Sequence, residues 1–194
     1  MNNASVSTVG HGLSQAPELI IWKSLTSNTN YWQVLAQAAN GGNGHLGRLA
    51  LQRTDAFVAV SSVWNNTQPT STVFTLGTSC VGSGVAYCWH SVAGYSAIGT
   101  YTGSNPTKVT VNLGFEPSWI MIKSTSNSYG WYMLDNKRSP TGNWDDYLYA
   151  NSNGVEGTSG GNWIKAISTG FETNPSGGSV TNQNGVDYLY MAFK

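Results

Sequence analysis

The stretch GLSQAPELIIWKSLT at positions 12–26 decides the fold, because NLGFEPSWIMIKSTS at positions 112–126 repeats its pattern. In both, a proline is followed by a nearly continuous apolar run, which is typical of a strand covered on both faces. Proline has no N–H group for a strand ladder, so it is best placed where a strand begins. Residues 18–24 and 118–124 are therefore predicted to be central strands. At an offset of 100 residues the matched pairs are Val9 and Val109, Leu13 and Leu113, Pro17 and Pro117, Ile20 and Ile120, Lys23 and Lys123, and Ser24 and Ser124.

The match continues more weakly along the chain, which indicates an internal tandem duplication. We expect a first β-repeat over residues 1–92 and a second over residues 93–194, packed together as one compact unit. The paired strands are expected at 31–36 and 131–135, 47–52 and 146–151, 71–77 and 168–174, and 85–92 and 187–194.

The composition predicts an all-β fold. The chain has 23 glycines, 8 tryptophans and 10 tyrosines, and only 9% of its residues are charged, against about 25% in an ordinary soluble domain. Aromatic residues favour sheets, while glycine and asparagine supply the corners between short strands. Strands at about ten-residue spacing between such corners predict a β-sandwich or jelly-roll-like domain.

The net charge and the N-terminal sequence limit which partners and which cellular location are expected. The formal net charge is zero and no basic run occurs, so neither nucleic acid nor a membrane surface is an expected partner. The N-terminal residues MNNASVSTVGHGL lack the pattern of a secretory signal. We therefore expect synthesis in the cytoplasm, without membrane insertion.

Two lysines and two cysteines carry further expectations. Lys23 and Lys123 end the two repeated strands, and we expect their ammonium groups to reach water as solubilising strand ends. Cys80 and Cys88 flank VGSGVAY, so a cross-strand disulfide is geometrically conceivable, whereas cytoplasmic synthesis favours free thiols. The pair is too sparse for a structural zinc site, which needs four ligands.

The acidic residues give little support for catalysis. A glycan hydrolase needs two carboxylates across a groove, and only Asp135 with Asp145 and Asp146 could converge. The alternative is a solvated loop, or a salt bridge to Lys137 or Arg138. We expect a protein that is not an enzyme, with no catalytic residues, metal or cofactor.

Four aromatic residues lie in polar, turn-rich segments, where they could form a ligand-binding surface. Aromatic rings give a large contact area at low entropy cost, and their faces stack on sugars or partner chains. The alternative is that the rings fold back to close the end of a sandwich. The four residues are Trp64, Tyr129, Trp144 and Trp163.

Together, these motifs resemble a known viral domain. The segments APELIIWKS, LGFEPSWIMIKSTS, VAGYSAIGTYTG, PTSTVFTLG followed by VAYCW, and the closing YLYMAF are similar to the duplicated β-domain of structural proteins from tailed bacteriophages, especially marine phages and cyanophages. The resemblance covers essentially the whole chain. One feature differs: residues 94–103 introduce the second copy, and the first copy has no counterpart of that strand.

The resemblance implies a non-enzymatic virion structural protein, with no established catalytic residues. We expect a tail-fibre or appendage component or tip that attaches to host-surface glycan and contacts other virion proteins. A symmetric homo-oligomer, a trimer by the habit of such proteins, would cover exposed sheet edges. The alternative is a capsid decoration or cement protein bound to the major capsid protein. A third class, an appendage depolymerase, depends on the three aspartates.

Overall fold

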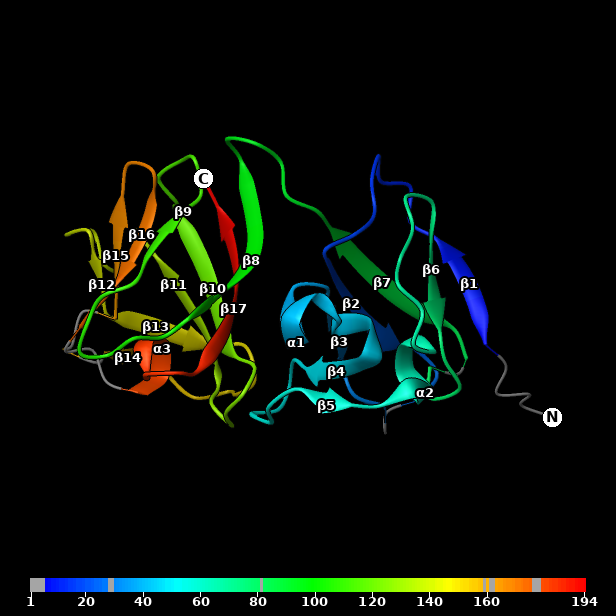
Figure 1. Ribbon diagram of the computed structural model, residues 1–194. Helices are drawn as coiled ribbons and strands as arrows, with labels where there is room; N and C mark the ends of the chain where they lie inside the picture. The colour runs from blue at the N-terminus through cyan, green and yellow to red at the C-terminus, as the bar shows by residue number, and fades with distance from the viewer. Residues whose placement is uncertain (1–5, 28–29, 81, 159, 161–162, 176–178) are drawn as a thin grey trace. The chain divides into compact units, whose positions relative to one another are not determined.

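The computed structural model describes residues 6–27, 30–80, 82–158, 160, 163–175 and 179–194 (Figure 1). Strands make up 42% of the protein and helices 8%, which confirms the predicted all-β class. The chain divides into two compact units, unit 1 (Met1–His90) and unit 2 (Ser91–Lys194). This division lies two residues before the predicted boundary between the repeats.

Unit 1 is built from a five-stranded and a two-stranded antiparallel sheet (Figure 1). Its larger sheet has the order β5 (Val58–Ala59), β4 (Gly47–Ala50), β3 (Gln33–Ala36), β2 (Leu19–Ser24) and β7 (Gly84–Trp89). The smaller sheet pairs β1 (Ser7–Gly10) with β6 (Val73–Leu76). The short helical segments are α1 (Ala39–Gly42), the 3-10 turn η1 (Gly44–Leu46) and α2 (Ser61–Trp64).

Unit 2 is a sandwich of a six-stranded and a four-stranded antiparallel sheet. The larger sheet has the order β14 (Gly157–Thr158), β13 (Asp146–Tyr149), β11 (Trp131–Asp135), β10 (Trp119–Ser124), β17 (Asp187–Phe193) and β8 (Ser96–Thr102). The smaller sheet has the order β12 (Asn143–Trp144), β15 (Ile164–Ile167), β16 (Gly170–Thr173) and β9 (Thr110–Asn112), and α3 (Ser179–Asn182) precedes β17.

Each unit has its own apolar core between its sheets. In unit 1, Ile20 of β2 and Leu35 of β3 share a buried cluster with Phe74 of β6. In unit 2, Ile120 of β10 shares a buried cluster with Phe171 of β16. Because residues from both sheets enter each cluster, burial of apolar side chains holds the two layers together.

The two units share a strand order. In the larger sheets, β5-β4-β3-β2-β7 of unit 1 corresponds to β14-β13-β11-β10-β17 of unit 2. In the smaller sheets, β1 pairs with β6 as β9 pairs with β16. Strand β8 extends the larger sheet of unit 2 beyond β17, and no strand lies beyond β7 in the described part of unit 1. This shared order favours the tandem duplication, which stays a prediction.

The two repeated lysines do not behave as expected. Lys123 is completely buried, and its ammonium donates to the carbonyl oxygens of Ser124 at 2.5 Å and Asn127 at 3.4 Å. Lys23 is half-buried and donates to the carbonyl oxygen of Asn30 at 2.6 Å. The expectation that both ammonium groups reach water is wrong for Lys123, because this side chain binds the turn that follows its own strand. Within the described residues, no helix is long and apolar enough to cross a membrane.

Candidate functional site

Three of the four aromatic residues predicted to bind a ligand lie in the cores. The exposed fraction is 0% for Trp64, 0% for Trp144 and 8% for Trp163. Trp64 ends α2 and packs in the core of unit 1, whereas Trp144 and Trp163 belong to the core cluster of unit 2. The prediction that these rings form an exposed binding surface is therefore wrong. The alternative, in which the rings fold back onto the sandwich, describes them.

Tyr129 retains a partly exposed ring. It is partly buried and packs against the core cluster of unit 2, and its hydroxyl donates to Gln183 Oε1 at 2.9 Å. Asn127 Nδ2 donates to the same oxygen at 2.9 Å. Tyr129 is thus held in place by a small hydrogen-bond network, and its role in ligand binding stays a prediction.

The acidic residues of the region 135–146 are engaged in local structure. Asp135 is 8% exposed, and its Oδ1 accepts from the backbone N–H groups of Lys137 and Arg138, both at 2.9 Å. Its other oxygen pairs with the Arg138 guanidinium, which was one of the alternatives from the sequence. Asp146 accepts from the Thr158 hydroxyl at 2.6 Å. The Ser139 hydroxyl lies 3.5 Å from Asp145 Oδ1 and 3.3 Å from Asp146 Oδ2. Each of the three carboxylates therefore has a structural partner in a turn or on a neighbouring strand.

The two cysteines are free thiols, Cys80 buried and Cys88 half-buried. Burial raises the pKa of Cys80 to about 12 and that of Cys88 to about 11. Both groups are therefore protonated near neutral pH, where thiols are poor nucleophiles. Among the residues that the structure describes, no group of three or more histidine, cysteine and acidic side chains is placed to hold a metal ion.

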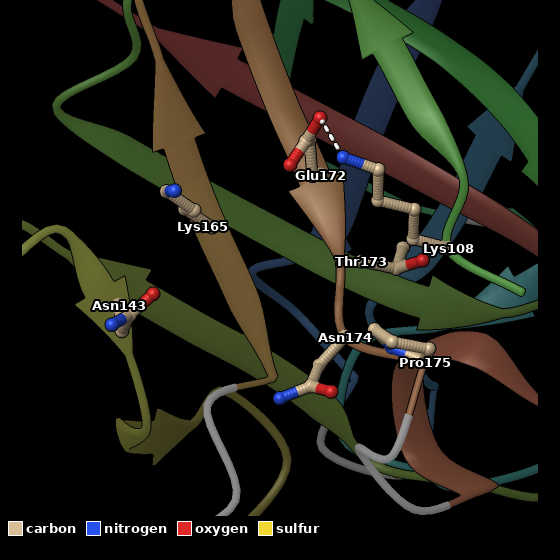
Figure 2. Close-up of a pocket in the computed structure, with 7 residues that line it drawn as sticks. All are labelled: Lys108, Asn143, Lys165, Glu172, Thr173, Asn174 and Pro175. Atoms are coloured by element: carbon tan, nitrogen blue, oxygen red, sulfur yellow. Dashed lines mark hydrogen bonds and ion pairs between the residues drawn. The ribbon is translucent and has the colours of Figure 1, made fainter. Parts of the chain in front are cut away.

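A polar groove lies on unit 2, on the smaller sheet (Figure 2). It has a volume of about 170 Å³ and is partly open to solvent. We call it the Lys108 groove; it is lined by Lys108, Asn143, Lys165, Glu172, Thr173, Asn174 and Pro175.

The register of the sheet explains how the groove forms. Asn143 of β12 lies opposite Lys165 of β15, which lies opposite Glu172 of β16, and Glu172 in turn lies opposite Thr110 of β9. Residues that lie directly opposite one another share a face of a sheet. Because successive residues alternate between faces, the next residue in β12, Trp144, points into the core. The outer face of four strands therefore carries one continuous polar row.

An ion pair fixes one side of the groove. Lys108 Nζ donates to Glu172 Oε1 at 2.7 Å, as Figure 2 shows, and the Thr110 hydroxyl donates to the same oxygen at 3.4 Å. The hydrogen bond from Lys108 lowers the pKa of Glu172 below its ordinary value, and Lys165 contributes in the same direction. Glu172 therefore stays ionised, and Lys165 is an exposed cation on the neighbouring strand.

Sequence reasoning did not find this groove. Its residues come from three separate segments, 108, 143, and 165–175, and none forms a motif. The signal that could have found them is alternation, because Lys165 and Glu172 each stand one residue away from a buried apolar neighbour, Ile164 and Phe171. That pattern places them outward but does not show that they lie side by side.

The fold and groove define a protein of two β-sheet units with a polar, partly open surface groove. Residues 1–194 match the family described as a domain of unknown function, DUF7483, and the chain belongs to this family. No curated protein and no solved structure matches the chain.

Proposed function

We propose that the protein is a non-enzymatic virion protein of a tailed bacteriophage, a tail-fibre or appendage component that binds host-surface glycan through the Lys108 groove. The virion assignment is supported by the motifs that resemble phage structural proteins. The glycan assignment is supported by the groove, and the observation that carries it is the polar row on the outer face of four strands.

The chemistry of the groove suits hydroxyl groups. Glu172 accepts hydrogen bonds, Lys165 donates them, and the side-chain amide of Asn143 does both. Sugar hydroxyls also donate and accept, so a row of such side chains can bind successive hydroxyls of a chain. Ligand pockets for drug-sized molecules are enclosed and mostly apolar. A polar groove that is partly open suits a polymer that extends beyond the site.

A glycan array tests the binding, with the purified full chain as the probe. Lys165→Ala and Asn143→Ala are expected to weaken retention at least about tenfold, which corresponds to about 1.4 kcal/mol. Lys137→Ala is the matched control, because Lys137 is an exposed lysine of unit 2 outside the groove. No retention on any glycan, or equal retention by the groove variants, would contradict the proposal.

The virion assignment has its own test. The chain is counted in the purified particle by quantitative gel densitometry against the major capsid protein, and located by antibody labelling. A low count at the tail supports the appendage. A high count over the head would favour the capsid-decoration alternative, and absence from the particle would contradict both.

A further inference from the structure

A second cavity, in unit 1, has the features of a built site. It has a volume of about 230 Å³, which is small beside the roughly 300–1,000 Å³ of drug-sized ligand pockets. It draws on the segment before β3, on β3, on β4 and on α2. We call it the Arg48 pocket; its polar lining is Asn30, Tyr31, Gln33, Arg48, Ser62 and Ser79.

Three buried polar atoms of this lining have no hydrogen-bond partner among the described residues: Asn30 Nδ2, Gln33 Oε1 and Arg48 Nη1. Gln33 itself is only 4% exposed. Buried polar groups in folded proteins are nearly always paired, because a buried group without a partner has given up its bonds to water. Two donors and one acceptor around one cavity therefore call for a partner inside it.

The charge of the pocket is also unbalanced. Arg48 and Arg53 both lie over the Tyr31 ring, with guanidinium carbons 4.7 and 5.2 Å from its centroid. Arg53 is paired with Asp55 at 2.5 Å. Arg48 forms no ion pair with a described residue. Burial lowers the pKa of Arg48, while Tyr31 and Asp55 act in the opposite direction, and an arginine stays charged in either case. One positive charge is left for a ligand.

The pocket lies on the inner face of the larger sheet, where a core is expected. Gln33 stands opposite Trp22 of β2 and Ala50 of β4, and Trp22 belongs to the core cluster of unit 1. In unit 2, the corresponding strands place Tyr132 opposite Ile122 and Tyr149. Gln33 therefore occupies the position that Tyr132 fills in the other unit.

The same correspondence applies to the neighbouring strand. Arg48 precedes Ala50 by two residues, as Tyr147 precedes Tyr149. In unit 2 these tyrosines form one packed aromatic group: the Tyr132 ring lies 5.6 Å from Tyr147 and 5.1 Å from Tyr149, centroid to centroid. Unit 1 has glutamine, arginine and alanine at these places, around an open volume. The two units thus share their strand order, but polar groups line a pocket in unit 1 where aromatic rings pack together in unit 2.

We propose that the Arg48 pocket binds a small hydroxycarboxylate, that is, a carboxylate with a neighbouring hydroxyl group. The carboxylate accepts from the Arg48 guanidinium and from Asn30 Nδ2, which satisfies both unpartnered donors and the charge. The ligand hydroxyl donates to Gln33 Oε1, which a sulfate ion cannot do because it has no proton to give at neutral pH. The Ser62 hydroxyl, which accepts from Ser79 Oγ at 2.8 Å, can donate to the ligand as well.

Two sources carry this chemistry: a free hydroxy acid, or the uronic acid unit of an acidic polysaccharide. Lactate stands for the first and glucuronate for the second. Propionate is the matched control for lactate because it lacks only the hydroxyl, and glucose is the control for glucuronate because it lacks the carboxylate. The site uses only residues of unit 1, so it stands apart from glycan binding at the Lys108 groove.

The test is a titration of the full chain, with binding read from ¹H–¹⁵N NMR signals of the backbone and of the arginine and glutamine side chains. Lactate or glucuronate is expected to shift signals of the pocket, with affinity at least tenfold above that of its control. If lactate binds more tightly than glucuronate, the ligand of the pocket is a free hydroxy acid. If glucuronate binds more tightly, the ligand is an acidic sugar.

Variants then identify the groups. Arg48→Gln is expected to weaken binding of the preferred carboxylate at least tenfold, whereas Lys137→Gln, which removes an exposed cation of unit 2, changes it less than twofold. Gln33→Leu is expected to abolish the preference for lactate over propionate and to leave propionate binding unchanged. The same spectra show whether each variant is folded. If Arg48→Gln does not fold, Gln33→Leu still tests whether the pocket recognises the ligand hydroxyl.

Three results would overturn the proposal: no shift of pocket signals by either carboxylate, equal binding of the preferred ligand by Arg48→Gln, or equal affinity of the wild type for the preferred ligand and its own control. Lys165→Ala is expected to leave this binding unchanged. The failure of this site and the failure of the Lys108 groove are therefore seen in different variants.

Discussion

Substitution of Trp144 tests whether its ring is part of the core of unit 2. Its side chain is completely buried, and its indole Nε1 has no hydrogen-bond partner among the described residues. Replacement by alanine removes a whole buried ring and leaves a cavity, so we expect a loss of about 3–5 kcal/mol in the free energy of unfolding.

Replacement by phenylalanine should have a much smaller effect. The smaller ring gives up two carbons, which costs about 1.5 kcal/mol at roughly 0.8 kcal/mol for each buried carbon. It also removes the unpartnered N–H group, whose burial costs about 1–3 kcal/mol. The two effects nearly cancel, so Trp144→Phe should lie within about 1.5 kcal/mol of the wild type.

Urea unfolding followed by circular dichroism measures both variants, with the free energy taken at a constant slope against urea. If the two units unfold in separate transitions, one transition should move and the other should stay. Val155→Ala is the control, because Val155 is a 90% exposed apolar residue of the same unit and should change stability by less than about 0.5 kcal/mol.

Two results would refute this reasoning. A cost below about 1 kcal/mol for Trp144→Ala would mean that the ring is not a core residue. Equal costs for the alanine and phenylalanine variants would mean that the indole N–H has a partner that stabilises it.

Three further predictions concern a thiol pair, the pH dependence and a glycine. At pH 8, Cys80 should react with a thiol reagent more slowly than Cys88. Both should react at least about tenfold more slowly than in the urea-unfolded chain, because burial keeps the thiols protonated. Equal rates in the folded and unfolded chain would contradict this prediction. Burial raises the pKa of Cys80 from 9.0 to about 12, so the contribution of this thiol to stability is complete below pH 9 and is lost as the pH rises toward 12. Over that pH range, the free energy of unfolding should fall less steeply for Cys80→Ala than for the wild type. Gly170→Ala should destabilise unit 2 by more than about 2 kcal/mol, because a Cβ there would lie 2.0 Å from the carbonyl oxygen of Val111, whereas Gly154→Ala, with an ordinary contact of 3.4 Å, should be nearly neutral in thermal unfolding.

The strands could be predicted because their signal is local. The segment WYMLD at 131–135 is strand β11 with the expected bounds, and 187–194 contains β17 at Asp187–Phe193. Apolar runs, prolines at strand starts and polar corners each act over a few residues, so one sequence is enough to find them.

The environment of single side chains could not be predicted in the same way. Trp144 stands in a segment rich in glycine and asparagine, and its strand β12 has only two residues, too few to show an alternation. The completely buried Lys123 closes the turn after its strand, although lysine at a strand end is usually exposed. Both depend on which distant segments close over the residue, and that information lies outside the local pattern.

The two candidate sites follow from one scaffold used in two ways. In unit 2 the interior positions carry Tyr132, Tyr147 and Tyr149, so the aromatic packing fills the core, and polar side chains gather on the outer face of the smaller sheet. In unit 1 the corresponding positions carry Gln33 and Arg48, and the polar groups line a pocket that is partly open to solvent. The predicted tandem duplication would account for both, because strand order depends on the apolar pattern of the central strands, and that pattern is shared by β2 and β10. The positions beside those strands are then free to change, so each unit can acquire a site of its own without a change in its fold.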